Sequence, residues 1–138
     1  MRKQITSNII GPGELSPGFH NYGLCNQLFQ IATCCSYAID NDYDAVFPCL
    51  RDRDRYGEYP TNIMRHLCFD DFIDPSYTVY QEPKFGYTPI PKLENSIVVA
   101  HSYCQSHKYF EHNRDHILNL FSPRPEDTKK IHDKYGDL

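Results

Sequence analysis

The order of hydrophobic patterns in the first fifty residues is the feature that most constrains the fold. Residues 4–10 are rich in β-forming side chains and lead into the chain-breaking sequence GPG at 11–13. Apolar side chains then recur at helical spacing over residues 24–39, and a short apolar run at 45–47 precedes Pro48. Strand, loop, helix and strand make a βαβ unit, and such units build parallel sheets. We therefore expect an α/β fold, with a Rossmann-like parallel sheet flanked by helices.

Two further strands are expected in the second half of the chain. The sequence SIVVAH at 96–101 is the clearest buried strand, because it contains three consecutive β-branched apolar residues, Ile97, Val98 and Val99. Residues 77–80 fit an edge strand, and residues 61–69 fit either a short helix or an extended segment.

The C-terminal third predicts two helices. An amphipathic helix is expected over residues 108–121, with Leu118 and Phe121 on its apolar face and Ile117 beside them. A second helix over residues 125–135 is expected to end at Gly136.

Composition narrows the class of protein. The chain has 138 residues, which suits one domain, and its formal charge of -4 with no basic run argues against nucleic acid as a partner. No apolar run reaches the roughly 18 residues of a membrane span, and no signal peptide is visible. The six cysteines include no CxxC pair, which favours buried free thiols over zinc ligation. We expect a cytoplasmic protein without a transmembrane segment, and peripheral association with a membrane stays open.

The sequence GLCNQLFQ at 23–30 places two amide side chains, Asn26 and Gln27, where the loop becomes a helix. Backbone N–H groups at a helix start suit a phosphate or another anion, and amides offer both donors and acceptors. The other interpretation is structural: Asn26 faces solvent and Gln27 packs on a neighbour. The loop before it, GPGELSPG, is neither a dinucleotide fingerprint nor a phosphate-binding loop of the Walker type.

Two blocks of the chain resemble glycosyltransferase family 11, the α-1,2-fucosyltransferase-like enzymes. The family carries Gly-Gly-Leu-Gly-Asn-Gln-Leu/Met-Phe-Gln after its first strand, and this chain has GLCNQLFQ. The family also carries Gly-Tyr-Phe-Gln-Ser-x-Lys-Tyr-Phe after a central strand, and this chain has SYCQSHKYF at 102–110. Each block follows a predicted strand here as it does in the family.

The resemblance implies a fold, an activity and a site. It implies the first Rossmann-like half of a GT-B-type glycosyltransferase that transfers fucose from GDP-fucose to a glycan hydroxyl, with inversion and without a metal or cofactor. Sugar nucleotide and glycan acceptor would be its partners, and the backbone amides of Cys25 and Asn26, with the Asn26 side chain, would stabilise charge on the leaving diphosphate. The implied substrate-binding residues are Gly23, Cys25, Asn26, Gln27, Gln105 and Ser106. The resemblance assigns no catalytic base.

The chain departs from the family pattern at three places. Cys25 stands where the motif has its second glycine, and Ser102 stands where the second block begins with glycine. The His-x-Arg-x-Gly-Asp segment, which supplies an arginine for the nucleotide diphosphate, is absent. We therefore expect residues 1–138 to form a single N-terminal domain, with a donor-binding second domain beyond residue 138, and to be inactive alone.

Other candidate residues have plainer interpretations. His101 at a strand end fits a general base or a structural histidine, and His112 with His116 has the i, i+4 spacing of a zinc pair or of an exposed helix face. The acidic residues Asp70, Asp71 and Asp74 fit a catalytic pair, a metal site or a polar loop.

Two alternatives to the transferase stay open. The first is a small α/β binding or interaction module without catalytic activity, in which Asn26 and Gln27 are structural. The second is a dinucleotide-binding domain, which is disfavoured because the glycine fingerprint is missing and Phe47-Pro48 stands where an acidic residue should end the second strand.

Overall fold

A parallel four-stranded sheet forms the centre of the molecule. A computed structural model of the chain describes residues 1–7, 24–52, 56–100 and 102–136. The strand order is β2-β1-β4-β3, and each neighbouring pair runs parallel. The strands are β1 (Gln4–Ser7), β2 (Asp44–Ala45), β3 (Tyr77–Tyr80) and β4 (Ser96–Val99). The predicted α/β class with a parallel sheet is confirmed.

The two inner strands, β1 and β4, are buried along their whole length. Ile5 lies opposite Ile97 and Ser7 lies opposite Val99, so the carboxyl ends of the two strands are level. Burial on both faces explains the continuous apolar run of β4, since a strand with one wet face would alternate. The outer strand β3 does alternate between exposed and half-buried residues, as the edge-strand prediction requires.

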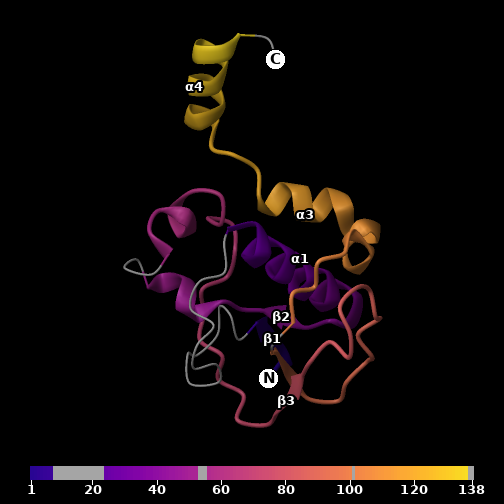
Figure 1. Cartoon of the computed structure of the whole chain (residues 1–138). Helices are drawn as coiled ribbons and strands as arrows, with labels where there is room; N and C mark the ends of the chain where they lie inside the picture. Colours follow the sequence, from indigo (N-terminus) through magenta and orange to yellow (C-terminus); the bar gives the residue numbers. More distant parts are fainter. Residues whose placement is uncertain (8–23, 53–55, 101, 137–138) are drawn as a thin grey trace.

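Helix α1 (Leu24–Asn41) packs against β1 and β2, and its buried side includes Ile31 and Cys34. It extends two residues past the predicted end and stops at Asp42, whose φ of 61° takes the chain out of the helix. Figure 1 shows α1 lying across the sheet with α3 (Arg114–Leu120) on its outer side.

The predicted helix over residues 108–121 is wrong as a single element. The chain instead forms two short 3₁₀ turns, η4 (His107–Tyr109) and η5 (Glu111–Asn113), followed by α3. The break occurs at Phe110, whose φ of -141° is not helical. The apolar face also differs: Ile117 is buried, whereas Leu118 is 53% exposed and Phe121 is partly buried. Local periodicity missed the break because tertiary contacts of Tyr109 hold the chain there.

Helix α4 (Pro125–Tyr135) matches the prediction at both ends. The Gly136 N–H donates to the His132 carbonyl at 2.8 Å, and Gly136 has a φ of 65°, which favours glycine. None of its residues is buried, and Figure 1 shows it standing away from the sheet.

Two further predictions need correction. The second strand is β2 rather than residues 45–47, because the Phe47 N–H donates to the Cys68 carbonyl and leaves the sheet. Residues 61–69 form neither an α-helix nor a strand; they consist mainly of turns after the 3₁₀ turn η3 (Tyr59–Thr61). Another 3₁₀ turn, η2 (Pro48–Arg51), follows β2.

All six cysteines are free, but only half are buried: Cys34, Cys35 and Cys104. Cys25 and Cys68 are exposed, so the prediction of buried thiols holds in part. Burial raises the pKa of Cys35 to about 12, which keeps this thiol neutral and unreactive at neutral pH.

The Ser96 hydroxyl joins the start of β4 to β1. It accepts from the Gln4 backbone N–H at 2.8 Å and donates to Asp74 at 2.6 Å. We predict that Ser96→Ala lowers the free energy of unfolding by about 1–3 kcal/mol, because it leaves a buried N–H without an acceptor. Urea denaturation measures this, with the exposed Ser76→Ala as the matched control; equal effects of the two substitutions would contradict the prediction.

The environment of the Asp74 carboxylate predicts that the stability of the fold depends on pH. Hydrogen bonds from the Ser96 hydroxyl and the Ser76 N–H lower its pKa. Its contribution to stability is therefore complete above the unfolded value of about 3.9 and is lost as the pH falls through the lower folded value. Asp74→Asn should flatten the loss of stability below about pH 4 in urea titrations at several pH values. If the free energy of unfolding still falls with pH as steeply as in the wild type, Asp74 contributes nothing to this pH dependence.

Candidate functional site

The turn that opens α1 meets the segment that follows β4. This segment, residues 102–106, forms a corner of the chain at the edge of the sheet. The side-chain amide of Gln105 donates a hydrogen bond to Asn26 Oδ1, although the two residues are 79 positions apart. The contact forms because β1 and β4 are adjacent and parallel, so the segments that follow them reach the same edge of the sheet. The structure thus brings together one predicted site residue from each block.

The other predicted site residues have different surroundings. Gln27 is buried, whereas Cys25 is exposed at the helix start. Ser106 Oγ accepts from the Lys108 N–H at 3.3 Å and caps η4, a structural role. Gly23 lies outside the described residues, as does His101.

Cys25 stands at the second glycine of the family motif, but it needs no backbone conformation that only glycine adopts readily. It lies within α1, and the non-glycine residues with positive φ in the described ranges are Asp42 and Cys104. The strained position of this site is therefore Cys104, in the corner, where φ is 52°.

Gln30 is a buried polar residue on the same helix that the sequence analysis passed over. It is fully buried, and the Ser7 hydroxyl at the end of β1 donates to its Oε1 at 2.6 Å. Its Nε2 has no hydrogen-bond partner, which is uncommon for a buried amide. The available signal was the spacing: Asn26 and Gln30 are four residues apart, so they share one side of α1.

Glu82 is a second such residue and lies just past the end of β3. Its carboxylate accepts from the Cys104 N–H at 2.9 Å and from the Tyr109 hydroxyl at 3.2 Å. Its own N–H donates to the buried Ser102 hydroxyl at 2.7 Å, which donates in turn to the Ala100 carbonyl at 2.8 Å. Ser102, a departure from the family glycine, therefore ties β4 to the segment after β3.

Burial controls the protonation of the groups around Glu82. It raises the pKa of Cys104 to about 12, and the Glu82 charge adds to the shift. It also raises the pKa of Tyr109, with the same carboxylate contributing. Both groups therefore remain protonated at neutral pH, and Tyr109 stays a hydrogen-bond donor.

The remaining polar candidates fill structural roles. His112 Nε2 lies 2.6 Å from Asp40, and Asn113 donates to Ser36 at 2.8 Å, so these contacts fasten η5 to α1. Asp71 forms an ion pair with Arg51. Within the described part of the chain, no group of three or more His, Cys, Asp or Glu side chains is placed to hold a metal ion.

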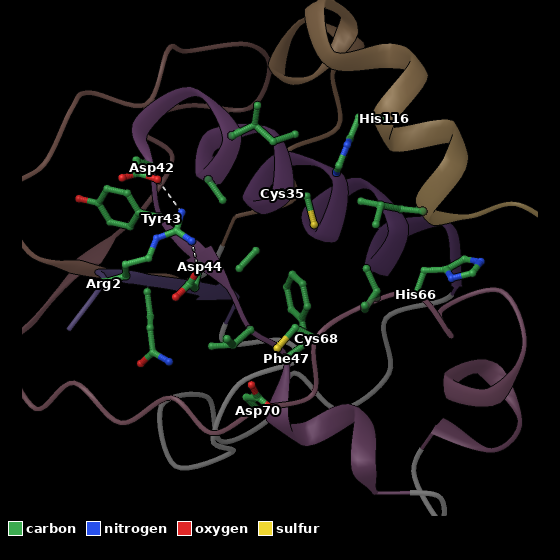
Figure 2. A pocket seen from close by; sticks show the side chains of 17 residues that line it. Arg2, Cys35, Asp42, Tyr43, Asp44, Phe47, His66, Cys68, Asp70 and His116 are labelled. Atoms are coloured by element: carbon green, nitrogen blue, oxygen red, sulfur yellow. Dashed lines mark hydrogen bonds and ion pairs between the residues drawn. The ribbon is translucent and has the colours of Figure 1, made fainter.

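A cavity of about 530 Å³ lies at the outer edge of β2. Figure 2 shows it from close by, and none of the described substrate-binding residues that the resemblance implies lines it. Arg2 and Asp44 lie on one side of it, and His66 and His116 lie on the other. The Arg2 guanidinium contacts Asp42 at 2.6 Å and Asp44 at 2.9 Å. This cavity is poorly suited to an anion, because its arginine is already neutralised.

A second depression of about 530 Å³ lies where the chain leaves β2. Pro48, Cys49 and Phe72 line it together with the Arg51–Asp71 pair. It is nearer the carboxyl edge of the sheet, but none of the substrate-binding residues that the resemblance implies within the described ranges lines it.

Comparisons with models of protein families, with curated proteins and with solved structures found no match. Among the described helices, none is long and apolar enough to cross a membrane. An assignment of function therefore depends on the site itself.

The buried Ser7–Gln30 pair allows a test of how much the unpaired Gln30 side-chain amide costs in stability. Ser7→Ala alone should cost about 1–3 kcal/mol, because it leaves both polar atoms of Gln30 buried without partners. Ser7→Ala combined with Gln30→Met should recover most of that loss, since the buried polar group is gone. Urea denaturation of both variants decides it; a double variant less stable than Ser7→Ala would contradict the account.

Proposed function

We propose that this chain is a glycosyltransferase domain that acts on GDP-fucose and transfers fucose to a glycan hydroxyl with inversion and without a metal. The observation that carries the proposal is the hydrogen bond between Gln105 and Asn26. It joins the two segments on which the family 11 resemblance depends, at the carboxyl edge where parallel sheets bind ligands.

The local chemistry suits a diphosphate leaving group. Negative charge grows on the diphosphate as the bond to sugar C1 breaks, and preorganised N–H donors stabilise that charge. The start of α1 supplies backbone N–H groups and the positive end of an 18-residue helix. Asn26 uses its oxygen to accept from Gln105, which leaves its amide N–H groups to donate to the ligand.

In this proposal the chain forms one side of a GT-B-type donor cleft, and a second domain supplies most contacts to guanosine. No residue of the chain is assigned as catalytic base. The binding-module alternative predicts that the same polar corner is purely structural and that GDP-fucose does not bind.

The proposal predicts the effect of Asn26→Ala. Loss of its amide should weaken use or binding of GDP-fucose by about 1–3 kcal/mol, the scale of a hydrogen bond to a charged group. Donor kinetics and calorimetric titration of the full-length protein, with both proposed domains, measure it. Asn119→Ala, an exposed amide on α3, is the matched control and should leave both unchanged. Equal donor affinity in Asn26→Ala and Asn119→Ala would show that Asn26 does not bind the donor.

A further inference from the structure

We propose that Glu82 is a positioning residue that holds the Gln105 corner in place against Asn26. The effect of Glu82 on donor binding rests on the proposed function, whereas its effect on the conformation of residues 102–106 does not. The inference starts from position: Glu82 follows β3, two residues past Tyr80, and it contacts the segment after β4 through both its backbone and its side chain.

The side-chain contact falls on the strained residue. Cys104 has a φ of 52°, a conformation that costs energy for a non-glycine residue. Its N–H points to Glu82 Oε1 at 2.9 Å, and a carboxylate is the strongest acceptor available for such a group. Gln105 is the next residue in the chain, so the backbone that carries its side chain is fixed by this bond.

The backbone contact holds the same corner from the other side. The Glu82 N–H donates to Ser102 Oγ at 2.7 Å, and Ser102 is two residues before Cys104. The Ala100 N–H donates to the Tyr80 carbonyl at 2.7 Å, so the ends of β3 and β4 remain paired up to the corner. Glu82→Ala removes the side-chain contact and leaves these backbone bonds in place.

Tyr109 explains how a neutral side chain can replace the carboxylate. Its hydroxyl accepts from the Thr88 N–H at 3.1 Å, and the Gly86 carbonyl lies 3.3 Å away as a second acceptor for its proton. A glutamine at position 82 can accept from the Cys104 N–H with its oxygen and donate to the Tyr109 hydroxyl with its amide. A positioning role therefore tolerates Glu82→Gln, whereas a role as general base does not.

The experiment compares E82A, E82Q and the exposed control E94A. Two quantities are measured: hydrogen exchange of the Cys104 amide, and GDP-fucose affinity by calorimetry. E82A should speed exchange and weaken GDP-fucose binding, each by roughly tenfold, because a charge-assisted hydrogen bond is lost. E82Q should stay within about threefold of the wild type in both, because the acceptor is kept. E94A should change neither.

Two outcomes overturn the inference: Cys104 exchange unchanged in folded E82A, or E82Q as damaged as E82A. If E82A does not fold, E82D gives the same test, because its shorter side chain draws the carboxylate away from the Cys104 N–H. Failure of the wild-type protein to bind GDP-fucose would overturn the proposed function, and the exchange measurement would still decide the role of Glu82.

Discussion

The pairing of β1 with β4 is the interaction on which the rest of the structure depends. Their side-by-side, level arrangement at the centre of the sheet directs the segments after both strands to one edge. Helix α1 packs on the sheet, and its first turn lies at that same edge, where Asn26 meets Gln105. Everything proposed about function follows from this meeting of two distant segments.

The polar groups of residues 102–106 lie at the edge of a buried core, so they need hydrogen-bond partners within the protein. Cys104 and Tyr109 donate hydrogen bonds to the Glu82 carboxylate, and the Glu82 N–H donates to the Ser102 hydroxyl. These bonds satisfy buried polar groups that would otherwise lack partners. The same network accounts for a serine where the resembling family has glycine and for the positive φ of Cys104. By contrast, the cavity beside β2 is built around an arginine that is already paired with carboxylates.

Elements with strong local signals were predictable from the sequence. The apolar run of β4, the periodic stripe of α1 and the proline and glycine that bound α4 each specify an element without help from the rest of the chain. The helix expected over residues 108–121 failed because Tyr109 is held by groups on the segment 82–88, a contact that no local window contains.

The same contrast between local sequence signals and tertiary contacts applies to the residues of the candidate site. Asn26 and Gln105 could be singled out by motif, since each follows a recognisable strand. Glu82 could not, because it lies in a proline-rich connection and its partners come near only after β3 pairs with β4. Gln30 was accessible through its spacing from Asn26, but its burial and its unpaired amide are properties of the packed structure.

The central claim is that the joined Asn26–Gln105 corner receives a sugar nucleotide. Titration of the ¹⁵N-labelled protein with GDP-fucose, followed by nuclear magnetic resonance, tests it most directly because it reports every amide at once. The account predicts saturable shifts at the backbone and side-chain amides of residues 24–30 and 102–106, with α4 unaffected. Shifts confined to the cavity beside β2, or no shifts at all, would contradict it.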